Sequence, residues 1–484
     1  MINRCTPVAL AAALLMAGCS FIPTYERPAA PVPGAYQTGS PALAGAATAA
    51  AGPWKDYFAD PRLQTLIGAA LANNRDLRVA ALNIEQARAQ FQIRRADQFP
   101  GVGLGVNASR GPSASNGDLA NSFSVGLAVS AWEIDFFGRI ASLKEQALAQ
   151  YLASEEGRKA AQVSLVAAVA NGWLSLLADE ELLNLSRRTL TSREESVRLT
   201  RLRLDAGVAS ELDFRQAESL TQAARATLAQ QQRQRALDEN ALALLLGQPV
   251  PADILASLVG STLANAPVLT PLPAGLPSEL LIQRPDIRQA EQQLIAANAN
   301  IGAARAAFFP RISLTAQAGT TSGELSGLFK SGSWGFSIAP SLLLPIFDAG
   351  RNQAGLASSQ VSRSIAVAQY EKAIQTAFRE VSDALAGQST LAEQSTALQR
   401  QAQAEEARLR LADLRYRNGV SSYLDLLDAE RSLFATQQGA VQVRLAELQN
   451  QVLLYKALGG GGTAEATPAA ASVAAPEAPA KSRS

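Results

Sequence analysis

The residue types available for chemistry in this chain are limited. Its 484 residues include no histidine, two cysteines and two methionines, with a formal charge of +1. Histidine is the commonest general base and metal ligand, so its absence removes much hydrolytic and metal chemistry. Both methionines and Cys5 precede Cys19. If that segment is a cleaved leader, the remaining chain has one cysteine and no methionine, which excludes disulfides, thiol catalysis and the usual soft-metal ligands.

Enzymatic catalysis would then depend on carboxylates, lysine, serine or tyrosine, and no nucleophile motif surrounds any of these residues. We therefore predict that the protein is not an enzyme and has no metal site or cofactor. The near-neutral charge also gives no electrostatic reason to expect a nucleic-acid partner.

Two carboxylates have a spacing that could serve ion selection. Asp425 and Asp428 are three residues apart, so they share one face of a helix. Three copies of the chain would place six carboxylates around a constriction, which favours cations and resists closure unless it is counter-charged. The alternative is two ordinary acids on a solvated helix face, and spacing alone favours that alternative.

The N-terminus has the features of a bacterial export signal. Residues 1–18 combine a basic start at Arg4, an apolar run and small residues before Cys19, and the run is too short to span a bilayer. The sequence LMAGC resembles a lipobox, which makes Cys19 the expected lipid-modified residue. Ser20 after it favours sorting to the outer membrane. The alternative is an ordinary signal peptide with an incidental cysteine.

The chain is a tandem duplication. Residues 77–100 are echoed by residues 287–310 at an offset of 210, and residues 203–247 are echoed by residues 415–459 at an offset of 212. A repeat of about 170 residues is a duplicated subdomain and not a short solenoid unit. We assign repeat 1 to residues 54–247 and repeat 2 to residues 286–459.

Low-complexity segments flank and join the repeats. Residues 19–53 are rich in Pro, Ala and Gly and predict an extended, weakly ordered tether that carries the lipid. The proline-rich residues 248–285 form the connector, which we assign to an equatorial region. Residues 460–484 contain few large side chains and predict a disordered tail.

Each repeat contains a β-hairpin followed by two long helices. Apolar and polar residues alternate within residues 101–132 and 311–345, which predicts strands with one apolar face. A hairpin of a soluble protein shows the same alternation of apolar and polar residues, but the export signal favours outer-membrane strands. The first helix of each repeat is predicted from near 138 to 205 and from near 350 to 417, on the order of 100 Å long.

Four membrane strands per chain require more than one copy. An open sheet edge is not tolerated in lipid, and bacterial barrels have at least eight strands. Two chains would give eight strands with a filled interior, whereas three would give twelve, enough for a channel. The expected fold class is therefore an α+β membrane protein, a trimeric tube with a helical extension.

Six segments together resemble one family. These are CSFIPTY at 19–25, WKDYFADPRLQTLI at 54–67, GLPSELLIQRPDIRQAE at 275–291, AAFFPRISL at 306–314, LPIFDAGR at 344–351 and RYRNGVSSYLDLLDAE at 415–430. They are similar to the outer-membrane factors of tripartite efflux systems, the TolC-like channels, and most to the OprM/NodT lipoprotein branch. The resemblance covers almost all of the chain after Cys19, except the alanine-rich tail.

The resemblance implies a homotrimer with a twelve-stranded barrel in the Gram-negative outer membrane and a long helical barrel in the periplasm. It implies a passive export duct for drugs or other small molecules, anchored by lipid on Cys19. Its implied partners are a periplasmic adaptor (a membrane fusion protein) and an inner-membrane pump of the RND type, which supplies the energy.

The resemblance also assigns a periplasmic gate. It favours the acidic ring of Asp425 and Asp428 over the solvated face, and adds Tyr416 and Asp213 as closing residues. Ser421 stands where TolC has an arginine that partners the acid, so another arginine is expected to replace it. The candidates for the arginine that partners the acid in this chain are Arg417, Arg415 and Arg203.

The turns between the long helices are the expected adaptor contacts, because they form the exposed end of each helical hairpin. Their alternative role is only to reverse the chain direction, which the glycines do in any case. The residues assigned to these adaptor-contact tips are Arg203, Gly207, Val208, Arg415, Arg417, Gly419 and Val420.

Other functions stay open on the sequence alone. Within transport, the duct could serve metal efflux or type I secretion, although the absence of Met, His and Cys after Cys19 argues against a copper or silver path. From a different class, the chain could be a surface-anchored structural coiled-coil lipoprotein. The hairpins at matched repeat positions argue against that function.

Overall fold

The computed structural model describes residues 20–33, 36, 53–112, 117–263 and 283–460. The chain divides into two compact units, which are residues 1–32, 75–161 and 281–378, and residues 33–74, 162–280 and 379–484. Each unit therefore contains segments of both repeats. The predicted signal peptide, the lipidated Cys19, most of the tether, the middle of the connector and the tail lie outside the described residues.

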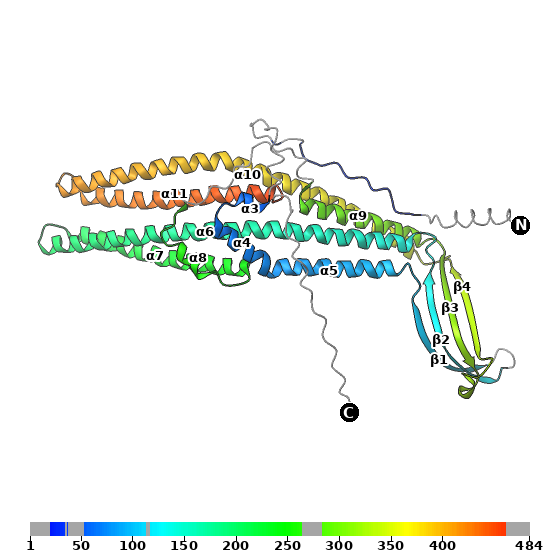
Figure 1. Ribbon diagram of the computed structural model, residues 1–484. Coiled ribbons are helices and arrows are strands. Elements are labelled where there is room, and N and C mark those ends of the chain that lie inside the picture. The colour runs from blue at the N-terminus through cyan, green and yellow to red at the C-terminus, as the bar shows by residue number, and fades with distance from the viewer. Residues whose placement is uncertain (1–19, 34–35, 37–52, 113–116, 264–282, 461–484) are drawn as a thin grey trace, which may run out of the picture. The chain divides into compact units, whose positions relative to one another are not determined.

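The first unit contains one four-stranded antiparallel sheet (Figure 1). The strands occur in the two hairpins where the alternating pattern predicts them, and their order in the sheet follows the sequence. The central pair, β2 and β3, joins one hairpin of each repeat. The bounds are β1 Val102–Pro112, β2 Leu119–Glu133, β3 Arg311–Ser322 and β4 Trp334–Leu343.

The outer strands of the sheet are open. β1 pairs with β2 and β4 pairs with β3, so one edge of each outer strand has no partner among the residues that the structure describes. Every residue of β4 is exposed, including Trp334, Phe336 and Ile338. Exposed apolar side chains on a strand with a free edge fit a sheet that is completed by other strands and faces lipid.

Two glycines permit the close pairing of the repeats. Gly126 of β2 lies opposite Gly319 of β3. A Cβ added at Gly126 would lie 2.4 Å from the carbonyl oxygen of Ala318, and one added at Gly319 would lie 2.2 Å from the carbonyl oxygen of Val125. Backbone atoms of paired strands cannot move aside cheaply, so glycine is required at this crossing.

We predict that Gly319→Ala destabilises the sheet by about 1–3 kcal/mol, because the added methyl group overlaps the backbone of β2. The matched control is Gly335→Ala, since Gly335 pairs with Gly319 from the other side and has open space around its Cα. Heat-modifiable mobility and β-sheet circular dichroism of the purified protein measure the effect. Equal behaviour of the two variants would contradict this account of the crossing.

The segment after Cys19 is not weakly ordered throughout, contrary to the expectation for the tether. Residues 20–33 are extended and run antiparallel to α9 (Pro285–Ala306) in the first unit. The side chain of Asn298 donates to the carbonyl oxygen of Pro23 at 2.7 Å, and Arg27 donates to both carboxylate oxygens of Glu291 at 2.7 and 3.0 Å. Bidentate guanidinium–carboxylate pairs are strong and directional, so they fix the register of this segment. We call residues 20–33 the strap.

The strap lies against α9, one of the four described helices that contribute to the first unit. These helices are α5 (Arg75–Ala96), α9, and the first parts of α6 (Arg139–Asp205) and α10 (Arg351–Arg417). Phe21 of the strap stacks on Phe309, with ring centroids 4.6 Å apart, and Phe309 stacks on Phe137 in turn. The strap therefore begins in an aromatic cluster at the residues that precede β3.

The second unit contains two helical hairpins. Figure 1 shows α7 returning beside the end of α6, and α11 returning beside the end of α10. Both first helices have 67 residues and end at the predicted positions, 205 and 417. The other helices are α3 (Trp54–Tyr57), α4 (Pro61–Asn73), α7 (Glu211–Leu246), α8 (Ala252–Ser257) and α11 (Tyr423–Ala457).

Helix α6 is the one helix among the described residues that is long and apolar enough to cross a membrane. However, 56% of its apolar stretch is buried within the protein. Val169, Ala170 and Leu176 of this helix are fully buried. This is the pattern of a core helix in a bundle.

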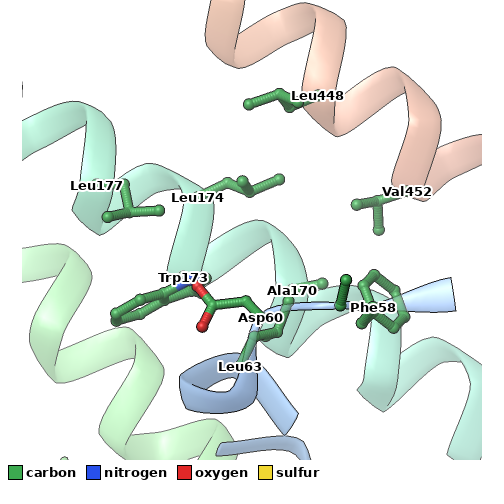
Figure 2. A pocket seen from close by; sticks show the side chains of 10 residues that line it. Phe58, Asp60, Leu63, Ala170, Trp173, Leu174, Leu177, Leu448 and Val452 are labelled. Atoms are coloured by element: carbon green, nitrogen blue, oxygen red, sulfur yellow. Dashed lines mark hydrogen bonds between the residues drawn. The ribbon is translucent and has the colours of Figure 1, made fainter. Parts of the chain in front are cut away.

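A buried carboxylate joins the short N-terminal helices to the second unit's core (Figure 2). Asp60 caps α4 by accepting from the N–H of Arg62 at 2.9 Å, and it also accepts from the indole N–H of Trp173 at 3.2 Å. Leu448 and Val452 of α11 line the same small cavity, of about 20 Å³. That volume holds a water molecule and no larger ligand, so this cluster is structural.

Candidate functional site at the helical tips

The first tip is closed by a glycine turn. α6 ends at Asp205, Gly207 has φ of +73°, and the N–H of Val208 donates to the carbonyl oxygen of Arg203 at 2.9 Å. This backbone bond closes the turn after a helix, which requires a residue that tolerates the left-handed region. The predicted tip residues of repeat 1 therefore lie together in one turn.

The second tip repeats the same geometry. Gly419 has φ of +69°, and the N–H of Val420 donates to the carbonyl oxygen of Arg415 at 2.9 Å. The duplication thus extends to single hydrogen bonds. Val208 is 73% exposed and Val420 is 63% exposed, so both tips present an aliphatic side chain to their surroundings.

Two of the predicted gate acids cap the returning helices. Asp213 accepts from the backbone N–H of Ser210 at 3.2 Å, and the N–H of Asp213 donates to the Ser210 hydroxyl at 3.1 Å. Asp425 and Ser422 form the same box, at 3.1 and 3.2 Å. Each carboxylate thereby satisfies a free N–H and lies at the positive end of a helix. The sequence analysis missed this role, although the spacing Ser-x-x-Asp is its signal.

Asp428 has a different partner, which the sequence analysis also missed. Its carboxylate accepts from Arg408 of α10 at 2.5 Å, and Arg408 also contacts Glu405 at 3.2 Å. Asp425 and Asp428 are three apart on α11, as expected, but each is engaged within its own hairpin. The two acids are therefore already counter-charged or capped in a single chain.

Tyr416 links the two tips. Its hydroxyl accepts from Arg203 of α6 at 2.5 Å, and the Arg203 guanidinium lies 5.0 Å from the Tyr416 ring centroid. Arg417 instead pairs with Asp413 on its own helix at 2.9 Å. Of the three candidate arginines, Arg203 is the one whose side chain reaches from one hairpin to a predicted gate residue on the other.

A small apolar core lies behind this link. It is centred on Tyr423 of α11, whose hydroxyl lies 2.9 Å from the hydroxyl of Ser196 of α6. Burial raises the pKa of Tyr423, so the phenol stays neutral and available for hydrogen bonding. The buried members of the core are Ala217, Tyr423, Leu426 and Leu427, and the partly buried ones are Val197, Leu220, Leu409, Ala412 and Tyr416.

The tips also expose residues that the sequence analysis did not select. Leu212 is 66% exposed and Leu424 is 55% exposed, each four residues after an exposed valine. The valines lie in the turns and the leucines lie in the first turns of α7 and α11, so each tip exposes two aliphatic side chains.

The described residues contain no group of three or more His, Cys, Asp or Glu side chains that could hold a metal ion. Cys19, the predicted lipidation site, lies outside the described residues. The candidate functional features among the described residues are the open sheet and the two tips.

Comparisons with known proteins identify relatives that cover most of the chain. A model of the outer membrane efflux protein family matches residues 66–248 and 276–460, which correspond closely to the two repeats. The toluene efflux pump outer membrane protein TtgC of Pseudomonas putida is 47% identical over 458 residues, which are 93% of this chain and 94% of that protein. The outer membrane protein OprJ of Pseudomonas aeruginosa is 46% identical over 463 residues, which are 94% of this chain and 95% of that one.

Solved structures show the same fold. A membrane protein from Pseudomonas aeruginosa is similar with a TM-score of 0.83 and 45% identity, covering 92% of this chain and 98% of that one. The open state of the MtrE outer membrane channel of Neisseria gonorrhoeae has a TM-score of 0.82 and 43% identity, with the same coverage. The fold is TolC-like, and the location is the outer membrane of a Gram-negative bacterium. On these grounds the chain belongs to the outer membrane efflux protein family, whose members are channel components of efflux systems.

Proposed function

We propose that three copies of this chain form a passive export duct through the outer membrane. The observation that carries the proposal is the four-stranded sheet, two edges of which have no partner in the described part of the chain. In lipid, free edges leave backbone N–H and C=O groups unsatisfied, which is too costly to persist. Three copies give twelve strands, and a barrel of that size is wide enough for solutes.

The duct itself performs no chemistry in this proposal. An inner-membrane pump of the RND type supplies the energy, and a periplasmic adaptor joins the pump to the tips. The relatives named as outer membrane proteins of toluene and antibiotic efflux pumps support small apolar or amphiphilic molecules as the cargo. The adaptor-contact residues are those of the two turns, together with the exposed Leu212 and Leu424.

A lipid on Cys19 would anchor the duct at a defined height. The strap runs antiparallel to α9, and Phe21 stacks on Phe309, two residues before β3 begins at Arg311. Cys19 precedes Phe21 by two residues. An acyl chain on Cys19 would therefore enter the membrane beside the periplasmic base of the barrel.

The gate in this proposal is the contact between the two tips. Arg203 holds Tyr416 by a charge-assisted hydrogen bond and by contact with the ring. Asp213 and Asp425 keep the returning helices ordered, and Asp428 fixes the second hairpin through Arg408. Opening requires the tips to separate, so the Arg203–Tyr416 contact has to break.

We predict that in-cell crosslinking followed by purification of the tagged chain recovers a periplasmic adaptor and an RND pump, identified by mass spectrometry. The pump's class then narrows the cargo. Recovery of an ABC transporter would indicate a secretion duct instead. Efficient crosslinking that yields neither kind of partner would contradict the tripartite function.

We predict that Arg203→Ala raises cell susceptibility to a large hydrophilic antibiotic several-fold, because the tips lose the contact that joins them. The matched control is Arg233→Ala, an exposed arginine on α7. Growth inhibition by vancomycin at equal amounts of outer-membrane protein measures the leak. Unchanged susceptibility of Arg203→Ala would contradict the gate assignment.

A further inference from the structure

One buried arginine of α6 contacts two other helices of the second unit. Arg193 of α6 is 6% exposed and lies twelve residues before that helix ends. Its guanidinium donates to the carbonyl oxygen of Leu220 on α7 at 3.0 Å and lies 5.4 Å from the ring centroid of Phe434 on α11. Arg193 therefore joins the first hairpin to the second, behind the tips.

The hydrogen bonding of this arginine is incomplete. Its Nε has no partner, and neither has Oε2 of Glu430 on α11. A buried polar atom without a partner is costly, and native proteins keep such atoms where they serve a purpose. Glu430 and Phe434 are four residues apart, so they share the face of α11 that meets Arg193.

The charged groups around Glu430 come from three helices. Burial raises the pKa of Glu430, Asp413 of α10 raises it further, and Arg193 of α6 opposes both effects. Burial lowers the pKa of Arg193, with Arg431 of α11 acting in the same direction and Glu430 opposing it. The acid and the base thus influence each other, although the two unpartnered atoms are not hydrogen-bonded.

The duplication provides an equivalent pair of positions at which this acid–base arrangement is absent. At the offset of 212, the counterpart of Arg193 is Glu405 and the counterpart of Glu430 is Glu218. Glu405 pairs with Arg408, and the half-buried Glu218 pairs with Arg215. An acid–base pair behind the tips therefore exists at one of two equivalent places, where the chain departed from its own repeat.

We propose that Arg193 and Glu430 are the two halves of an ion pair that forms in a second arrangement of the hairpins. In the arrangement described here, the guanidinium contacts Leu220 and Phe434. In the second arrangement it contacts the carboxylate of Glu430. The exchange requires a displacement along α11 of about one turn, roughly 5.4 Å. Arg193 is thus a positioning residue that couples movement of one hairpin to the other.

The inference rests on the proposed duct function, because the two arrangements correspond to two conductance levels of the channel. Two substitutions each remove the contact that stabilises one of the two arrangements. Phe434→Leu removes the cation–π contact of the described arrangement and leaves the ion pair available. Glu430→Gln removes the ion pair and leaves the Phe434 contact available. A residue pair with a merely structural role would lose stability in both variants, without opposite effects on conductance.

The test is single-channel recording of the purified full-length protein in planar lipid bilayers. We expect Glu430→Gln and Phe434→Leu to shift the ratio of the two conductance levels in opposite directions, each by about two-fold or more. In an Arg193→Gln background both shifts should disappear, because neither contact can form. The matched control is Arg188→Gln, an exposed arginine on α6 that should leave the ratio unchanged.

Acid should act on the wild-type protein as Glu430→Gln does. The raised pKa of Glu430 means that its neutral form is reached at a higher pH than for an exposed glutamate. The ion-paired arrangement needs the charged form, so lowering the pH favours the described arrangement. This pH dependence should be absent in Glu430→Gln.

Thermal unfolding and heat-modifiable mobility of each variant separate misfolding from altered gating. Shifts of both variants in the same direction would overturn the inference, as would a Glu430→Gln effect that persists undiminished in Arg193→Gln. A wild-type protein that forms no conducting channel would instead contradict the duct function itself. These outcomes are distinguishable in the same recordings.

Discussion

The interaction on which the rest of the structure depends is the backbone pairing at the edges of the sheet. The described residues of one chain supply four strands and leave an edge of β1 and an edge of β4 unpaired among themselves. In water such edges could be solvated, but in a bilayer they have to be closed by other strands. In the proposed trimer, further copies of the chain close these edges. Neighbouring copies would also cover exposed apolar residues of the long helices, such as Val361 and Ile365.

The two repeats share a backbone but have different side-chain chemistry at the tips. The turns at Gly207 and Gly419 have nearly equal φ angles, and both returning helices begin with the same Ser–Asp box. The contacts that join the hairpins are unequal, since Arg203 and Arg193 of repeat 1 reach across to repeat 2. The duplicated backbone therefore carries contacts between the hairpins that are not symmetric.

Local signals in the sequence were sufficient for much of the fold, because they depend on near neighbours. Alternation predicted the strands, and the glycines at 207 and 419 predicted where the long helices end. Long-range contacts could not be predicted. The pairing of β2 with β3 joins segments almost 200 residues apart. Arg27 of the strap binds Glu291, 264 residues away, and the composition of the strap alone gave no sign of this contact and suggested weak order. At the tips, the Ser-x-x-Asp signal was present but overlooked, whereas the Arg408–Asp428 pair depends on the packing of two helices.

The most direct measurement of the central claim is disulfide crosslinking between β1 and β4 of different copies in intact cells. Apart from Cys5 and Cys19 the chain is free of cysteine, so pairs introduced at Val102, Leu104 or Val106 and at Trp334, Phe336 or Ile338 give an unambiguous signal. The account predicts that at least one pair yields a covalent ladder that ends at three chains. A ladder that ends at two chains, or crosslinks confined to single chains, would contradict the trimeric barrel.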